Sequence, residues 1–116
     1  MNKPGILDRT FNFSLKSIEL YRRLLSQNEY IISKQLLRSA TSIGANVHEA
    51  SAAFSKRDFA FKMSIASKEA RETQYWLRLL DESNLINYDL TYYREEIVNI
   101  INITTAIVKT SQKNLK

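Results

Sequence analysis

The sequence predicts an all-α protein folded as an antiparallel, up-down-up-down four-helix bundle in a single domain of 116 residues. Two observations support this prediction. The chain contains only two glycines and one proline, which leaves almost no room for hairpin turns or a Rossmann unit. Apolar residues also recur every three or four positions, as in amphipathic helices, near residues 7–26, 29–54, 56–83 and 88–113. No strand is expected.

The first predicted helix carries an apolar stripe formed by Leu7, Phe11, Ser14, Ile18, Tyr21 and Leu25. Asp8 falls near the start of this helix, where a carboxylate interacts favourably with the helix dipole. Asn28 is a suitable N-cap for the second helix. A connection of about two or three residues joins the two helices, so they are expected to lie antiparallel.

The second predicted helix has two stripes of different chemistry. Its apolar stripe consists of Leu36, Ala40, Ile43, Val47, Ala50 and Phe54. About 100° further round the helix lies a small and polar series formed by Gln35, Ser39, Ser42, Asn46, Glu49 and Ala53. The second series predicts a contact zone beside the core.

The third predicted helix begins at a capping box formed by Ser55 and Asp58. Its apolar seam consists of Phe59, Met63, Ala66, Ala70, Thr73, Leu77 and Leu80. A mixed flank of carboxylates and large apolar residues runs beside the seam and includes Glu69, Glu72 and Trp76. Because an unpaired carboxylate out of water is very costly, Glu72 needs a donor, and Arg38 is the predicted partner.

The fourth predicted helix follows a connection at residues 84–89, with Asn87 or Asp89 as its cap. Its stripe consists of Leu90, Tyr93, Ile97, Ile100, Thr104 and Ile107, widened by Ile101 and Val108. The predicted core of the bundle therefore includes Phe11, Ile18, Ile43, Val47, Phe59, Met63, Leu77, Ile97 and Ile100.

Positive charge is concentrated in the first half of the chain. Residues 1–57 carry a net charge of +5, whereas residues 58–116 are neutral, and the pI is about 9.6. Such a balance favours a polyanionic partner. The candidate nucleic-acid-binding residues are Lys34, Arg38, Lys56, Arg57, Lys68, Arg71, Tyr75 and Arg78. An aromatic ring among cations could stack on a base. The alternative is a solvated helix face whose cations pair with Glu69 and Glu72.

A second candidate site is a polar seam formed by Ser42, Asn46 and Glu49, with Glu72 expected opposite them on the third helix. Asn46 has both a donor and an acceptor and could join carboxylate and backbone groups in one network. Two interpretations remain open. The seam could set the helix register and the contact between copies, or it could line a site for a ligand or a nucleic-acid base.

Residue types needed for catalysis or metal binding are scarce. The chain has no cysteine, and its single histidine, His48, does not form a Glu-x-x-His pair. Ser39 and Ser42 have no histidine at nucleophile–base spacing, and no Gly-rich phosphate loop occurs. We therefore expect no enzymatic activity, no metal and no cofactor. With no apolar N-terminal segment and no run near ~20 apolar residues, a cytoplasmic location away from membranes is expected.

Helices two and three resemble a known family. The matching positions are Arg38, Ser42-Ile43, Asn46-Val47, Glu49, Ser55, Asp58-Phe59, Ile65-Ala66, Glu72 and Leu77, within SIGANVHEA and KEARETQYWLRLL. These segments resemble the small bacterial four-helix-bundle family whose founding members are encoded by intervening sequences in 23S ribosomal RNA genes. Two departures are Ala50 after Glu49, where the family often has glycine, and a very short loop before helix two.

This resemblance implies a left-handed antiparallel bundle and a ring-shaped homo-oligomer, usually a pentamer. It implies no established enzymatic activity. More distantly, the chain is similar to accessory proteins of diversity-generating retroelements, which are basic pentameric bundles that contact nucleic acid. Two hypotheses follow. The protein is either a ring that binds RNA or DNA through a basic surface, or a self-associating scaffold whose partner is an unidentified protein.

Overall fold

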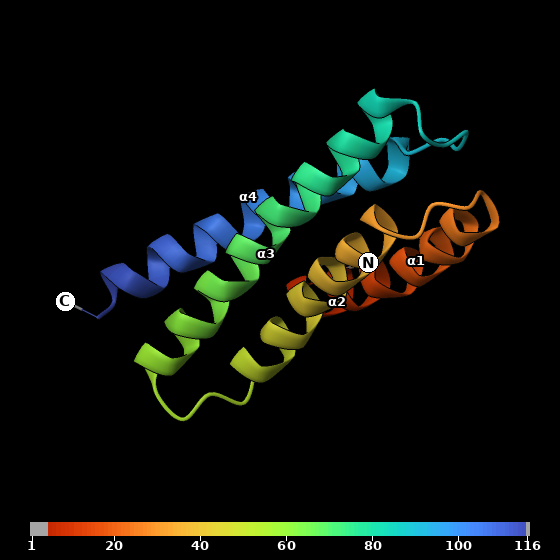
Figure 1. The fold of residues 1–116 in the computed structure, drawn as a ribbon. Helices are drawn as coiled ribbons and strands as arrows, with labels where there is room; N and C mark the ends of the chain where they lie inside the picture. Colours follow the sequence, from red (N-terminus) through yellow and green to blue (C-terminus); the bar gives the residue numbers. More distant parts are fainter. Residues whose placement is uncertain (1–4, 116) are drawn as a thin grey trace.

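The computed structural model describes residues 5–115, which form four helices and no strand (Figure 1). The helices are α1 (Ile6–Ser26), α2 (Ile32–Ala50), α3 (Lys56–Ser83) and α4 (Thr91–Lys113). The predicted all-α class and four-helix bundle are confirmed. The largest differences from the predicted bounds occur at α2, which begins later and ends earlier, and at the start of α4.

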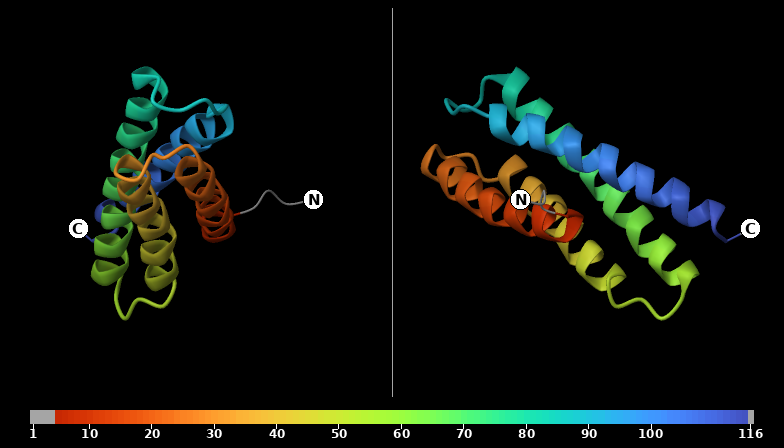
Figure 2. Two further views of the ribbon diagram at one scale, coloured as in Figure 1. Left: turned by 45° about the vertical axis from the view of Figure 1, so that its right-hand side comes forward. Right: turned by 180° about the vertical axis from the view of Figure 1, so that it is seen from behind.

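Helices that are consecutive in the chain are neighbours in the bundle. α2 packs against α1 and α3, α3 packs against α4, and a smaller contact between α1 and α4 closes the bundle. The α1–α2 and α3–α4 connections lie at one end, and the α2–α3 connection lies at the other (Figures 1 and 2). The α1–α2 and α3–α4 connections contact each other, because the Gln27 side-chain amide exchanges two hydrogen bonds with the Asn87 backbone.

The core is formed by large side chains from all four helices. The largest fully buried apolar side chains are Phe13, Leu20, Leu24, Ile43, Met63, Leu77, Leu80, Ile97 and Ile100. The predicted stripes of α3 and α4 therefore face the core, as does that of α2 up to Ala50. Phe54 is fully exposed because the chain has left the helix by that point.

The predicted stripe of α1 is wrong. The buried side of this helix carries Thr10, Phe13, Ser17, Leu20 and Leu24. In contrast, Leu7, Phe11 and Ile18 are exposed, and Phe11 retains 63% of its accessible surface. Both series have helical spacing, but the buried one includes two hydroxyl residues that weaken its apolar signal. Those hydroxyls are satisfied locally, since Thr10 and Ser17 donate to carbonyl groups one turn earlier.

α1 and α2 approach closely at Gly44. A Cβ atom at this position would lie 3.1 Å from the Ser14 Oγ and 3.2 Å from the Thr10 carbonyl oxygen. Both distances are shorter than ordinary van der Waals contacts, and the carbonyl belongs to the backbone of α1. The missing side chain therefore allows the two helices to pack at this separation.

Polar and aromatic contacts join α1 to α4. The Arg9 guanidinium on α1 donates two hydrogen bonds, of 2.9 and 2.8 Å, to the Glu96 carboxylate on α4. The Tyr93 hydroxyl donates to the Lys16 carbonyl at 2.8 Å, and the Phe13 and Tyr93 rings pack edge to face. These contacts position α4 against α1.

The helix ends differ in part from the predicted caps. Ser55 accepts a hydrogen bond from the Asp58 N–H at 3.0 Å, which confirms the predicted start of α3. Asp89 accepts hydrogen bonds from Thr91 at the start of α4. Asn28 does not cap α2. It has a φ of 64° and ends α1, a role for which asparagine is suited when glycine is absent.

Glu29 caps α2 instead. Its carboxylate accepts hydrogen bonds from the backbone N–H groups of Ile31, Ile32 and Ser33, at 3.0, 3.0 and 2.5 Å. Burial raises the pKa of the Glu29 carboxyl, but these hydrogen bonds, together with one from the Ser33 side chain, outweigh burial and lower its pKa overall. The carboxylate therefore stabilises the folded chain above the unfolded pKa of about 4.3, and this contribution is lost as the pH falls through the lowered folded pKa.

We expect Glu29→Ala to lower the free energy of unfolding by about 0.5–2 kcal/mol at neutral pH, the usual effect of removing a helix cap. The difference from the parent should shrink in acid, where the Glu29 carboxyl is protonated. Urea unfolding at neutral and acidic pH measures both effects. Glu95→Ala is the control, because Glu95 is exposed on α4 and makes no ion pair within residues 5–115. An equal loss in the two variants would contradict the assignment of the cap.

Candidate nucleic-acid interface

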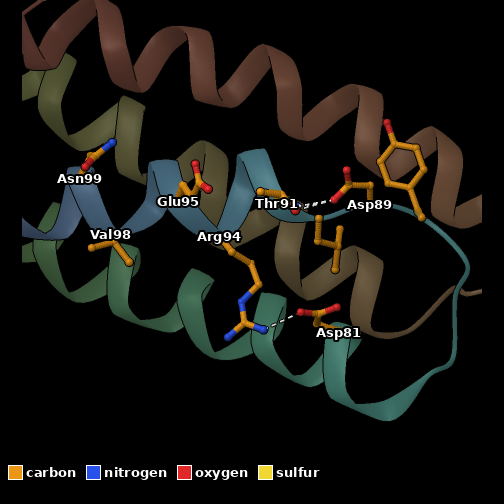
Figure 3. A pocket seen from close by; sticks show the side chains of 9 residues that line it. Asp81, Asp89, Thr91, Arg94, Glu95, Val98 and Asn99 are labelled. Carbon is orange, nitrogen blue, oxygen red and sulfur yellow. Dashed lines mark hydrogen bonds and ion pairs between the residues drawn. The ribbon is translucent and has the colours of Figure 1, made fainter.

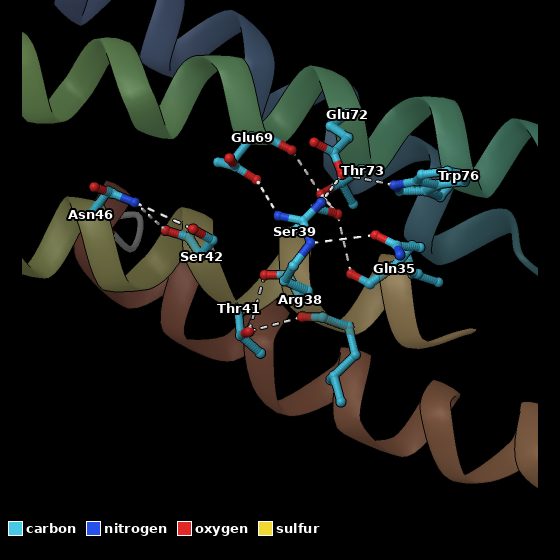
Figure 4. A network of polar contacts seen from close by, with 12 residues as sticks. Gln35, Arg38, Ser39, Thr41, Ser42, Asn46, Glu69, Glu72, Thr73 and Trp76 are labelled. Atoms are coloured by element: carbon cyan, nitrogen blue, oxygen red, sulfur yellow. Dashed lines mark hydrogen bonds and ion pairs between the residues drawn. The ribbon is translucent and has the colours of Figure 1, made fainter. Parts of the chain in front are cut away.

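A polar network joins α2 to α3 beside the core (Figure 4). The Arg38 guanidinium on α2 donates to the Glu72 carboxylate and lies 3.4 Å from a Glu69 carboxylate oxygen, both on α3. The Trp76 indole N–H also donates to Glu72, at 2.9 Å. The predicted pairing of Arg38 with Glu72 is confirmed.

Two hydroxyl groups extend this network into the core. The Ser39 and Thr73 hydroxyl oxygens lie 2.8 Å apart, and both residues are fully buried. The Thr73 hydroxyl also lies 2.8 Å from the Glu69 carbonyl oxygen. Within residues 5–115, no buried side-chain polar atom lacks a hydrogen-bond partner. All these groups are thus satisfied within the protein, which favours a structural role for the network.

The predicted polar seam does not form around Glu72. The Asn46 amide donates to the Ser42 carbonyl at 2.8 Å, within its own helix, and Glu49 pairs with Lys62 at 2.9 Å. The reason is the helix register. Because α2 and α3 are antiparallel and Arg38 lies opposite Glu72, Glu49 lies near the start of α3. The expectation that Asn46 and Glu72 share one network is wrong.

The eight candidate nucleic-acid-binding residues do not form one surface. Arg38 belongs to α2 and lies between α2 and α3, where Glu69 and Glu72 bind its guanidinium. Arg71 lies on the α4 side, where its guanidinium donates to the Thr105 hydroxyl at 3.1 Å. Arg78 pairs with Glu82. Lys34 is exposed near the start of α2, and Lys56 is exposed at the start of α3.

A smaller group of the predicted residues does lie together. Arg57, Lys68, Arg71 and Tyr75 are exposed along one side of α3, since their separations correspond to nearly whole helical turns. The neighbouring carboxylates on α3, Glu69 and Glu72, are directed toward α2. The cations on this side of α3 are therefore not paired with Glu69 or Glu72.

Sequence reasoning missed two lysines that extend this group. Arg71 meets Thr105 of α4, and Lys109 and Lys113 follow Thr105 at intervals of four residues, so they lie on the same side of α4. Arg57, Lys68, Arg71, Lys109 and Lys113 are all exposed, and no ion pair involves any of them within residues 5–115. We call these five residues the basic face.

The charge count concealed the basic face because opposite charges in the second half of the chain are separated in space. Asp81, Glu82, Asp89, Glu95 and Glu96 lie near the α3–α4 connection, whereas the basic face begins further along both helices. Counting the charges turn by turn along the antiparallel α3 and α4 would have separated the acidic end of the hairpin from its basic part. The neutral sum over residues 58–116 gives no sign of it.

The acidic end of the α3–α4 hairpin contains a groove (Figure 3). Within it, Arg94 donates to the Asp81 carboxylate at 2.6 Å and the Asp89 carboxylate accepts from the Thr91 hydroxyl. Within the described residues, no three His, Asp or Glu side chains lie close enough to hold a metal ion.

A third surface, formed by α1 and α2, is apolar. Leu7, Phe11, Leu15 and Ile18 are exposed along α1 at helical spacing. Leu7 and Phe11 also line a shallow groove with Thr41, Gly44, Ala45 and His48 of α2. We call the four exposed α1 residues and this groove the apolar face. α1 is therefore apolar on the side that faces the core and on this outer side.

The sequence model of a family described as 23S rRNA-intervening sequence protein matches residues 3–106. The chain belongs to this family. One solved structure has a similar fold. It is a Bacteroides thetaiotaomicron protein of unknown function from the S23 ribosomal protein family. Its TM-score is 0.85 and its sequence identity 40%, over 90% of this chain and 95% of that chain. A comparison with curated proteins finds no match.

Membership of the 23S rRNA-intervening sequence family confirms the resemblance seen in helices two and three, and the match extends it into α1 and α4. The structure of the relative supports the four-helix architecture, but its function is unknown. Among the described helices of this family member, none is both long and apolar enough to cross a membrane.

Proposed function

We propose that this protein is a non-enzymatic homo-oligomer that binds nucleic acid through the basic face. The observation that supports binding is the group of five exposed cations on α3 and α4 with no carboxylate partner in the described chain. Such a group can replace the counterions of a phosphate backbone. RNA is the first nucleic acid to test, because the family description refers to 23S rRNA.

Self-association is proposed to occur through the apolar face. A helix with a second apolar side normally buries that side as well, and the bundle covers only one of the two apolar sides of α1. The apolar face lies on the α1–α2 hairpin and the basic face on the α3–α4 hairpin, so the two proposed contacts use different residues. The family resemblance implies a ring, with five copies expected. Light scattering at micromolar concentration that gives a mass near 13.5 kDa would exclude this assembly.

The alternative function is a self-associating scaffold for another protein, with positive charge serving solubility. The apolar face supports this alternative as well, so nucleic-acid binding decides between the two. In the scaffold, labelled RNA and DNA would remain unbound even near ~50 mM salt.

We expect labelled RNA to bind at about 50 mM salt and to lose affinity steeply by about 200 mM salt. Replacing both Lys68 and Lys109 with glutamine should weaken binding and reduce the slope of log affinity against log salt by about 1 per lost phosphate contact. Lys34→Gln is the control for each single substitution, Lys68→Gln and Lys109→Gln, because it removes the same charge and Lys34 is exposed on α2. An equal loss in Lys34→Gln would show that net charge, and not this face, determines binding.

A further inference from the structure

Two exposed aromatic residues lie on the same side of α3 as its basic residues. Phe61 retains 59% of its accessible surface and Tyr75 retains 58%. Phe61 precedes Lys68 by seven residues and Arg71 by ten, and Tyr75 follows them by seven and four. These separations are close to whole helical turns, so the rings and the cations share one stripe. In order along α3 the stripe presents a ring, two cations and a second ring.

The Tyr75 ring is held in place from inside the protein. It packs edge to face against Trp76, with ring centroids 5.1 Å apart. The Trp76 indole is fixed in turn by its hydrogen bond to Glu72, which is bound by Arg38. A ring whose position is already fixed loses little side-chain entropy when a ligand stacks on it. The polar network between α2 and α3 thus supports the exposed aromatic position.

The distance between the rings suits a short strand. Phe61 and Tyr75 are fourteen residues apart, or about 21 Å along a helix. At roughly 3.4 Å per nucleotide, a stacked strand covers that distance with about six nucleotides. Site sizes of about 4–16 nucleotides are common among single-strand-binding modules that combine cations with stacking platforms.

We propose that the α3 side of the basic face binds single-stranded nucleic acid, with bases stacked on Phe61 and Tyr75 and phosphates contacted by Lys68 and Arg71. This inference rests on the proposed nucleic-acid binding and adds the type of strand. A duplex presents its phosphates but keeps its bases paired inside, so the two rings have no stacking partner on it. The chemistry therefore favours an unpaired strand over a duplex.

The test compares three labelled probes of about 12 nucleotides: single-stranded RNA, the corresponding duplex, and an abasic strand that keeps the phosphates. The parent should bind the single strand most tightly. Phe61→Leu and Tyr75→Leu should each weaken single-strand binding by about 5- to 150-fold, the range for loss of one stacked base. Neither substitution should change binding of the abasic strand. Tyr30→Leu is the matched control, since Tyr30 is also 58% exposed but lies before α2.

Failure of this inference is distinguishable from failure of the proposed function. If no probe binds at low salt, both are wrong. If the single strand and the duplex bind equally, and both leucine variants bind as the parent does, the basic face binds phosphates alone and the stacking inference is overturned. A changed mass of the assembly in Phe61→Leu or Tyr75→Leu would also overturn it, because the rings would then serve contacts between copies.

Discussion

Ile43→Ala is expected to lower the free energy of unfolding by about 2–5 kcal/mol, the usual cost of a large-to-small change in a packed core. Ile43 is 0% exposed and belongs to the contiguous core cluster. Removing its outer carbons leaves a cavity that the surrounding helices can fill only partly. Thermal or urea unfolding at one fixed protein concentration measures the effect, since dissociation of an oligomer makes stability depend on concentration.

Val98→Ala provides the comparison for Ile43→Ala. Val98 is also a β-branched residue within a helix, but it is exposed on α4. Its truncation should change stability by no more than about 0.5 kcal/mol, as is usual for surface positions. If Ile43→Ala melts at the same temperature as the parent, the assignment of Ile43 to the core is wrong.

Phe11→Glu is expected to dissociate the proposed oligomer without unfolding the chain. Phe11 is exposed in the single chain, so a charged side chain is tolerated there. In an assembly that covers the apolar face, the same carboxylate would be removed from water without a partner, at a cost of several kcal/mol. Light scattering should therefore give a mass close to the 13.5 kDa of one chain. Circular dichroism should still show a helical protein.

Asn12→Glu separates the effect of position from the effect of charge. Asn12 is also exposed on α1 but lies about 100° round the helix from Phe11. This variant adds the same negative charge and should keep the mass of the parent. A Phe11→Glu variant that remains as large as the parent would show that copies associate through a different surface.

The sequence was sufficient to predict three of the four core stripes. Ile43, Met63 and Ile97 lie in series whose apolar character has no competitor on the same helix, so periodicity alone identifies the buried side. α1 has two competing series. The more apolar one, which contains Phe11 and Ile18, lies outside the bundle, and periodicity does not favour the series of Phe13 and its hydroxyl neighbours. Three of the misassigned residues, Leu7, Phe11 and Ile18, belong to the apolar face.

The polar contacts were predictable only where chemistry left few choices. A partly buried Glu72 required a donor, and Arg38 was available on the neighbouring helix. Periodicity does not determine how far one helix is shifted along another, so the position of Asn46 relative to Glu72 was not predictable. For the same reason Lys109 was not recognised as a neighbour of the α3 cations, since their proximity depends on the register of α3 and α4.

The absence of a side chain at Gly44 has a consequence for association. The close approach at this position restricts sliding between α1 and α2, and these two helices together carry the apolar face. A surface that is already rigid before it meets a partner loses less conformational entropy on binding. A larger residue at position 44 would press against the Thr10 carbonyl and the Ser14 hydroxyl, and it would change the spacing of α1 and α2 beneath Leu7, Phe11, Leu15 and Ile18 without replacing any of these four residues. The strength of association would then be altered from inside the protomer, through preorganisation of the interface.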